Sequence, residues 1–165
     1  MDSLISNLIL FLFFSISNTI ASLALPLKWL NPRNRIFRSR AWEKGGAIYQ
    51  KLFRVKKWKN SLPELGDFFK SIFYKKKIQR FDNEYLEIYV IESCRAELTH
   101  ESIIAASFLF AIWAEASVFL TVIYISLLLN IPFIMIQRYN RPRILRMIKQ
   151  TKPVYGELAE DITIG

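Results

Sequence analysis

Three stretches of this sequence carry no charged residue, and they limit the possible folds more than any other feature. They cover residues 3–27, 102–114 and 116–137. A helix of about 20 apolar residues is long enough to cross the hydrocarbon core of a bilayer. The pattern therefore predicts a small all-α, multi-pass membrane protein. We expect a single domain over residues 1–165, with spans at about 4–27, 102–114 and 117–137.

The first uncharged stretch has two readings, a cleaved signal peptide or a retained anchor helix. Signal peptides begin with positive charge and end in small residues at a cleavage site. Here the only early charge is the negative Asp2, and the apolar run is followed by Pro26, Lys28 and Trp29. These flanks predict a retained N-terminal anchor.

Positive charge predicts the orientation in the membrane, because Lys and Arg gather on the cytoplasmic side. Such residues follow the first span and the last one; they are Lys28, Arg33, Arg35, Arg38 and Arg40, and then Arg138, Arg141, Arg143, Arg146 and Lys149. We therefore expect a protein of the cell membrane with its N-terminus outside, a cytoplasmic segment 28–101 and a cytoplasmic tail 138–165.

The last two uncharged stretches predict a helical hairpin. A single straight helix over residues 102–137 would be about 54 Å long, which is too long for one crossing. A tight turn near Glu115 would make two antiparallel helices. The alternative is one span to about Leu129, a break at residues 130–132 and a short interfacial helix. Pro132 removes a backbone hydrogen bond and Asn130 can cap or stop a helix, so a break there is expected under either hypothesis.

The segment between the spans is basic and aromatic. Residues 28–101 hold 17 of the 23 Lys and Arg residues of a chain whose net charge is +9. Nucleic acid and anionic lipid headgroups both attract such a pattern, but a segment tethered between spans favours the membrane and excludes nucleic acid as a partner. An amphipathic interfacial helix is predicted over residues 42–58, and a second over residues 65–73. The first of these carries the aromatic residues Trp42, Tyr49, Phe53 and Trp58.

A third helix is predicted to begin with Asn83 as its cap and to continue to Ala114. It carries Glu97, His100 and Glu101, which share one face because they are three and four residues apart. An imidazole beside a carboxylate is a common general-base arrangement. We predict His100 as the catalytic base and Glu97 as the acid that orients it. The alternative is a structural ion pair at the membrane edge.

Several chemistries are excluded by what the sequence lacks. Cys94 is the only cysteine and His100 the only histidine, so an intrachain disulfide and the usual zinc site are both excluded. We expect no metal and no cofactor. A Gly-rich phosphate loop and a G-x-S-x-G elbow are absent. The His-x4-Asp pattern of glycerolipid acyltransferases is absent as well, because Ala105 occupies the position of the acid.

A second polar block, "NIPFIMIQRYNRPR" over residues 130–143, follows the last span. Arginine pairs bidentately with phosphate and carboxylate, so the block suits a headgroup or an acyl donor. The hairpin would bring this block beside Glu97 and Glu101. We predict that one of these two acids lies within salt-bridge reach of the block's arginines, and that His100 faces the same cavity.

Three blocks of the sequence resemble the glycosyl-4,4'-diaponeurosporenoate acyltransferase family, which acts in staphyloxanthin-type carotenoid biosynthesis. They are "WEKGGAIYQKLFRVKKWK" (42–59), "ESCRAELTH" (92–100) and "NIPFIMIQRYNRPR" (130–143). The resemblance covers roughly residues 40–146. Two positions depart from the family's pattern: Gly45 replaces a bulkier polar residue, and Glu101 stands where an aromatic residue is common.

The resemblance implies a membrane acyltransferase that esterifies a sugar hydroxyl of a glycosylated carotenoid or related glycolipid. The partners would be membrane lipid, an acyl thioester or lipid as donor, and the glycosylated acceptor. With His100 and Glu97 as catalytic residues, we expect substrate to be bound by Glu43, Trp58, Arg95, Arg138, Asn140, Arg141 and Arg143. The alternative function is a non-catalytic lipid- or pigment-binding subunit of a larger membrane complex, and the oligomeric state is left open.

Overall fold

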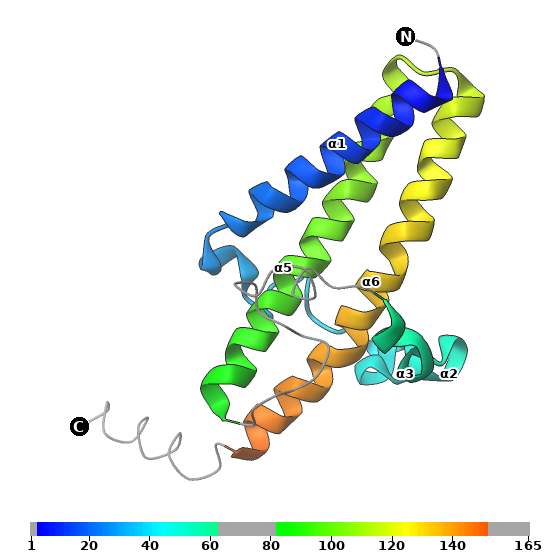
Figure 1. The fold of residues 1–165 in the computed structure, drawn as a ribbon. Coiled ribbons are helices and arrows are strands. Elements are labelled where there is room, and N and C mark those ends of the chain that lie inside the picture. Colours follow the sequence, from blue (N-terminus) through cyan, green and yellow to red (C-terminus); the bar gives the residue numbers. More distant parts are fainter. Residues whose placement is uncertain (1–2, 63–81, 152–165) are drawn as a thin grey trace.

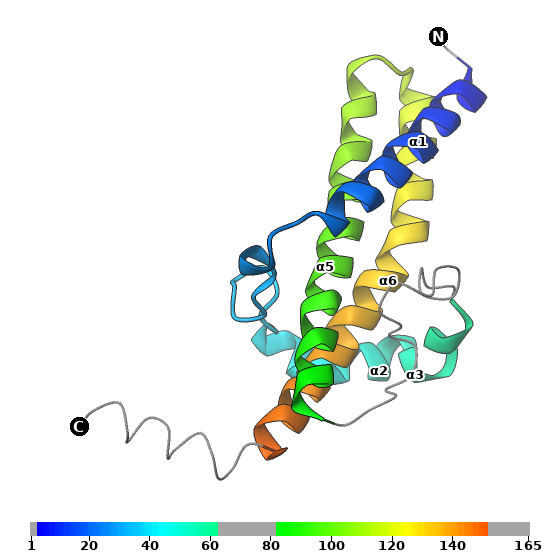
Figure 2. The same cartoon turned by 60° about the vertical axis from the view of Figure 1, so that its left-hand side comes forward.

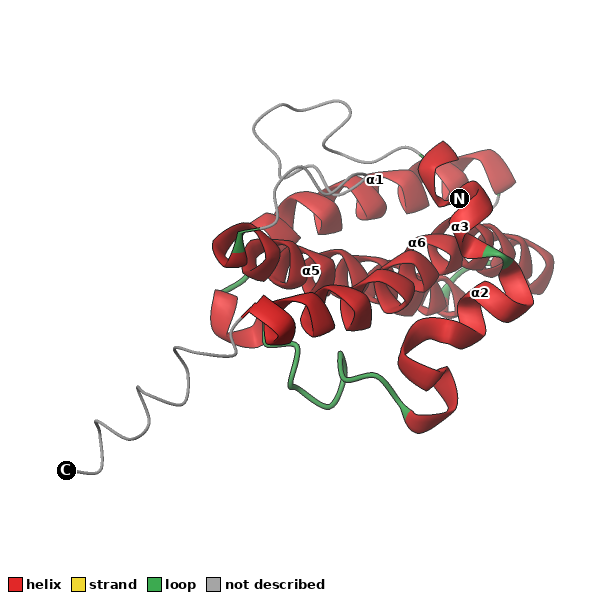
Figure 3. Ribbon diagram, turned by 90° about the horizontal axis from the view of Figure 1, so that it is seen from below, coloured by secondary structure: helices red, strands yellow, loops and turns green. Residues whose placement is uncertain are grey.

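The computed structural model describes residues 3–62 and 82–151, and within these residues every regular element is a helix (Figures 1 and 3). In chain order the elements are α1 (Leu4–Leu23), η1 (Leu27–Leu30), η2 (Ala41–Gly46), α2 (Ala47–Phe53), α3 (Val55–Trp58), η3 (Lys59–Ser61), α5 (Asn83–Ser107), η4 (Phe108–Ile112) and α6 (Ala116–Thr151). The predicted all-α fold class is confirmed.

The frame of the molecule is an antiparallel hairpin of α5 and α6, which lie side by side in both views of Figures 1 and 2. The 3₁₀ helix η4 extends α5 to Ile112, and α6 begins four residues later at Ala116. The predicted turn near Glu115 is therefore confirmed. Buried apolar residues join the two helices at both ends: Ile103, Phe110 and Val122 near the turn, and Leu86, Tyr89, Val90 and Ile144 at the open end.

The predicted break at residues 130–132 is wrong, because α6 is one helix from Ala116 to Thr151 with Pro132 and Pro142 inside it. The alternative with a separate interfacial helix after Leu129 is wrong for the same reason. α6 bends along its course (Figures 1 and 2). Contacts to α5 on both sides of Pro132 hold the helix together: Asn130 bonds His100, and Phe133 stacks on the same ring. Proline costs helix stability, but tertiary packing offsets that cost here.

The N-terminal helix α1 crosses the hairpin at its closed end (Figure 2). Ser3 begins it by accepting a hydrogen bond from the backbone N–H of Ser6. Polar and apolar contacts attach α1 to the hairpin. Asn18 Nδ2 donates to the Thr99 carbonyl, and Phe11 packs against Phe110.

The start of α5 differs from the prediction by one residue. Asp82, not Asn83, is the N-cap, and its Oδ1 accepts a hydrogen bond of 2.9 Å from the Tyr85 N–H. Both residues are good caps because each has a short side chain that carries an acceptor oxygen. Asp82 also adds a negative charge at the positive end of the helix dipole.

The single amphipathic helix predicted over residues 42–58 is divided into short pieces. Lys44, Gly45 and Gly46 have φ values of 48°, 60° and 85°, and Arg54 has φ 51°. These left-handed residues break the helical hydrogen bonding before and after α2. As a result Tyr49 is buried against α6 with Val55, Ile136 and Tyr139, while Trp42 and Phe53 stay exposed.

Two helices, Leu4–Leu23 and Ala116–Lys149, are long and apolar enough to cross a membrane. Many large apolar side chains on α1, η4 and the first half of α6 are exposed, including Ile5, Phe13, Ile112, Leu120 and Leu128. An exposed apolar surface of this kind suggests membrane association. The second predicted span, 102–114, forms the end of α5 together with η4, in agreement with the single helix predicted from Asn83 to Ala114. The predicted helix over residues 65–73 and the tail from 152 lie outside the described residues.

Candidate active site

An ion-pair cluster lies buried between α5 and α6. Glu97 is fully buried, and Arg138 Nε lies 2.7 Å from its Oε1. Arg141 Nη2 donates to the other oxygen, Oε2. Arg138 Nη2 also lies 3.9 Å from the partly exposed Glu101. The predicted pairing of Glu97 or Glu101 with the arginines of the 130–143 block is confirmed. A buried carboxylate needs such partners, because an unpaired charge in the interior is costly.

Arg141 is fixed by more than its ion pair. Its Nε and Nη2 donate to the hydroxyl and the carbonyl oxygen of Ser93 on α5, and its Nη1 donates to the carbonyl oxygen of Phe37. The guanidinium carbon of Arg141 lies over the Phe37 ring, 5.4 Å from the ring centroid. The loop before η2 is thus attached to the hairpin through this arginine.

Glu43 forms the other side of the cluster. Its Oε1 accepts hydrogen bonds from Tyr49 Oη at 2.6 Å and Arg138 Nη1 at 2.8 Å, and its Oε2 accepts one from the Arg40 N–H. Burial alone would raise the pKa of Glu43, but these hydrogen bonds outweigh it and hold the pKa below its usual value. Burial and the bond to Glu43 raise the pKa of Tyr49. At neutral pH the pair is therefore a neutral phenol donating to a carboxylate.

His100 lies one turn beyond Glu97 on α5, with two contacts from α6. Its Nδ1 is 2.8 Å from Asn130 Oδ1, and its ring stacks on Phe133 with centroids 4.7 Å apart. The amide of Asn130 is oriented by a second bond, because its Nδ2 donates to the Ser126 carbonyl. The amide oxygen can only accept, so Nδ1 of His100 carries the proton and the lone pair of the neutral ring is on Nε2.

The remaining predicted site residues, Asn140, Arg143, Trp58 and Arg95, have partners outside the ion-pair cluster. Asn140 accepts from Lys59 Nζ and donates to Tyr89 Oη, and Arg143 lies over the Tyr139 ring. Trp58 Nε1 donates to the Phe53 carbonyl, and its ring packs on the cluster around Tyr139. Arg95 points elsewhere, since its guanidinium donates to Ser22 O, Leu23 O and Glu92. Arg95 therefore caps α1 through the last carbonyls of that helix.

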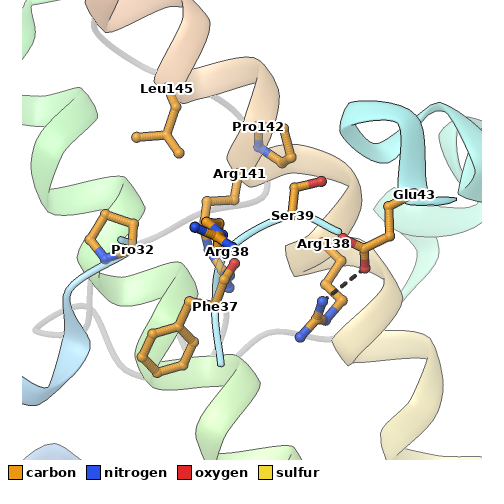
Figure 4. A pocket seen from close by; sticks show the side chains of 9 residues that line it. All are labelled: Pro32, Phe37, Arg38, Ser39, Glu43, Arg138, Arg141, Pro142 and Leu145. Carbon is orange, nitrogen blue, oxygen red and sulfur yellow. Dashed lines mark hydrogen bonds and ion pairs between the residues drawn. The ribbon is translucent and has the colours of Figure 1, made fainter. Parts of the chain in front are cut away.

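A cavity of about 180 Å³ adjoins the cluster, between the loop at residues 32–39 and α6 (Figure 4). Arg138 and Glu43 stand at one side of it, joined by their hydrogen bond. The full lining is Pro32, Phe37, Arg38, Ser39, Glu43, Arg138, Arg141, Pro142 and Leu145.

Some residues of the site were not predicted as such. Asn130 was expected only to stop a helix, and Phe133, Tyr49 and Ser93 were not singled out as site residues. Asn130 does carry a signal in the sequence, because a buried amide in an apolar run needs hydrogen-bond partners. The carbonyl oxygens of Ile36 and Phe37, which accept from Arg138 and Arg141, have no sequence signal at all.

Fold and site together define a class of protein. It is an all-α protein with two helices long and apolar enough to span a membrane, and it holds an imidazole and a buried arginine–carboxylate cluster between two antiparallel helices. A family model described as glycosyl-4,4'-diaponeurosporenoate acyltransferase matches residues 33–150. The chain belongs to this family, which confirms the resemblance found in the sequence.

Individual relatives agree with the family match. The glycosyl-4,4'-diaponeurosporenoate acyltransferase of Staphylococcus haemolyticus (strain JCSC1435) is 36% identical over 108 residues, which is 66% of this chain and 63% of that protein. The protein of the same name from Staphylococcus aureus (strain N315) is 29% identical over 128 residues, or 78% and 77% of the two chains. The first match thus spans somewhat less than two thirds of that relative's length. No solved structure matches the chain.

Proposed function

We propose that this chain is a membrane acyltransferase that transfers a fatty acyl group to a sugar hydroxyl of a glycosylated carotenoid or related glycolipid. Family membership supports the acyl transfer and the glycosylated carotenoid acceptor. The observation that carries the mechanism is the contact between His100 and Asn130, which places the lone pair of the neutral ring on Nε2. The exposed apolar surfaces of α1 and α6 suit a substrate with two long chains.

In the proposed reaction Nε2 of His100 removes the proton from the sugar hydroxyl as its oxygen attacks the acyl carbonyl carbon. The carbonyl oxygen becomes an oxyanion, and the guanidinium of Arg138 is the nearby positive group that would stabilise it. The tetrahedral intermediate then collapses to the new ester. The imidazolium returns its proton to the leaving group, which is a thiolate or an alkoxide.

Glu97 has a different place in this mechanism from the one predicted. Both of its oxygens face guanidinium groups, so it fixes Arg138 and Arg141 in position. Its predicted role in orienting His100 is untested, and Asn130 is the partner that the structure gives to Nδ1. We assign Glu97 as a positioning residue and His100 as the catalytic base.

For the topology we propose a multi-pass protein with its N-terminus outside and its C-terminus in the cytoplasm. The arginine-rich loop at residues 33–40 and the basic end of α6 both lie beside the open end of the hairpin, away from its turn. The positive-inside rule puts that end at the cytoplasmic face. The site would then lie at the inner edge of the bilayer.

The test is the His100→Gln variant, whose amide cannot act as a base at neutral pH. A positioned general base contributes about 10²–10⁴-fold in rate, so ester formation should fall by that factor. The readout is mass spectrometry of the glycosylated lipids formed by the purified protein, with circular dichroism to confirm that the variant keeps its helices. Near-normal turnover in a folded variant would contradict the assignment and favour the non-catalytic alternative.

A further inference from the structure

The cavity between the loop at residues 32–39 and α6, called here the loop–α6 pocket, is lined by three arginines and one carboxylate. Arg138 is paired with Glu43 and Glu97, and Arg141 is paired with Glu97. Glu101 also lies 3.9 Å from Arg138 Nη2, so three carboxylates surround these two guanidinium groups, and of the three only Glu43 lines the pocket. Arg38 adds a third positive charge to the lining, and no ion pair joins it to a carboxylate within residues 3–62 and 82–151. Arg38 is therefore the positive charge that remains for an anion in this pocket.

Hydrogen-bond donors remain for such an anion. A guanidinium has five N–H groups. Arg138 uses one each toward Glu43, the Ile36 carbonyl and Glu97, so one remains on Nη1 and one on Nη2, with Nη2 also 3.9 Å from Glu101. Arg38 is exposed, and Ser39 adds a hydroxyl to the same lining. Planar guanidinium groups bind the oxygens of phosphate in pairs, which gives both affinity and orientation.

The rest of the pocket is apolar, which distinguishes its ligand from a free inorganic ion. Phe37 and Pro32 come from the loop, and Pro142 and Leu145 come from α6 (Figure 4). These walls suit a carbon chain attached to the anion. A volume of about 180 Å³ holds a phosphate with its nearest carbon atoms, and not a whole lipid or nucleotide.

We propose that the loop–α6 pocket binds the phosphate ester of the acyl donor, with Arg38 as its principal free charge. This inference rests on the proposed acyl transfer. Two classes of donor share this chemistry, a thioester on a phosphopantetheine arm and a phospholipid. The position also fits, since Arg138 contacts Glu97, which precedes His100 by three residues, or about 4.5 Å along the helix. His100 was predicted to face the same cavity as the arginines but does not line this pocket, so the donor would have to extend from the pocket past Arg138 to reach the imidazole.

The test compares Arg38→Gln with Arg35→Gln in the full chain in zwitterionic nanodiscs. Both arginines are exposed on the same loop, but only Arg38 lines the pocket. Binding is measured without turnover, as the shift of the thermal unfolding midpoint caused by two probes, free coenzyme A and sn-glycerol 3-phosphate. Loss of a charge-assisted hydrogen bond should weaken binding of the active probe at least about tenfold in Arg38→Gln. Arg35→Gln should bind like wild type.

Kinetics provide the second measurement. Arg38→Gln should raise KM for the donor by a similar factor, with little change in kcat or in KM for the acceptor. Stabilisation by coenzyme A would identify a thioester donor, and stabilisation by glycerol phosphate a phospholipid donor. If neither probe binds wild type, or if both variants bind equally well, the pocket assignment is overturned. Probe binding that depends on Arg38 without any ester formation would keep the pocket and refute the acyl transfer.

Discussion

At the scale of single residues, the site depends on an amide that fixes a histidine. Asn130 is almost fully buried, and its two ends have separate partners, the Ser126 carbonyl and Nδ1 of His100. An aspartate would carry a negative charge at the same place, and a carboxylate beside an imidazole favours the charged ring. Asparagine accepts from Nδ1 without adding a charge, so it defines the tautomer in which Nε2 of the neutral ring has the lone pair that a general base needs.

This reasoning predicts a pH effect for substitutions at residue 130. In Asn130→Asp the acidic limb of the kcat/KM profile should move to higher pH, because the added carboxylate stabilises the protonated ring. In Asn130→Ala the rate should fall about tenfold or more without that displacement, since the ring loses its orienting partner. Glu97, Glu101 and Arg138 are unchanged in both variants, so their influence cancels in the comparison. A profile for Asn130→Asp that superimposes on wild type would exclude His100 as the titrating base.

At the scale of elements, the left-handed turn before α2 packs against the backbone of α6 just before Pro142. Pro142 has no N–H, so the carbonyl of Arg138 lacks its usual helical donor. Gly46 lies directly against this part of α6: a Cβ built on it would be 2.9 Å from the Arg138 carbonyl oxygen and 3.0 Å from that of Tyr139. Only glycine allows this approach, which brings Glu43 onto the Arg138 side chain.

The two neighbouring glycines provide a matched test of this contact. Both have positive φ, so an alanine at either position adds backbone strain of about 1–2 kcal/mol. Gly45 has nothing within 4 Å of a built Cβ, whereas Gly46 meets two backbone oxygens. Thermal unfolding should therefore show Gly46→Ala as less stable than Gly45→Ala by about 1–3 kcal/mol, the usual cost of overpacking. Equal stability of the two variants would mean that the turn does not pack tightly on α6.

At the scale of the whole molecule, polar and apolar residues are separated along the hairpin. Most of the large exposed apolar side chains lie on or beside α1, η4 and the first half of α6, while the loop arginines and the ion pairs lie toward the open end. Figure 1 shows α1 beside the closed end and α2 and α3 beside the lower half of α6. This polarity fits a protein whose closed end lies in lipid and whose open end meets water and headgroups.

The proposed topology can be checked by labelling introduced cysteines. Substitutions at Gly45 and Lys149 should react from the cytoplasmic side with a membrane-impermeant maleimide, and one at Asp2 from outside. The native thiol gives a low background, because Cys94 is fully buried and burial raises its pKa to about 11. Wild type treated in the same way is the control. Labelling of the Asp2 variant from the cytoplasm would overturn the orientation.

The sequence by itself determined those features that depend on neighbours along the chain. Long uncharged runs predicted α1 and the hairpin. The cost of an unpaired carboxylate near the membrane edge predicted that Glu97 or Glu101 would pair with the arginines of residues 138–143. The three family blocks predicted the family that the full comparison confirmed. The length of an apolar run decides whether a helix can cross a bilayer, and a buried charge needs a partner of opposite sign. Both hold for any chain with this pattern, whatever its detailed packing.

Only the tertiary structure decided the features that depend on contacts between distant segments. Local propensity favours a break at Pro132, but packing of Asn130 and Phe133 on His100 keeps α6 continuous. The same contacts changed Asn130 from an expected helix stop into the partner of the base. Arg95 was predicted to bind substrate with the other arginines, but it caps α1 because the C-terminal carbonyls of α1 lie beside it. Backbone carbonyls of Ile36 and Phe37 in the loop accept the remaining hydrogen bonds of the arginine cluster. Every residue has a backbone carbonyl, so the sequence does not show which carbonyls bind the arginines.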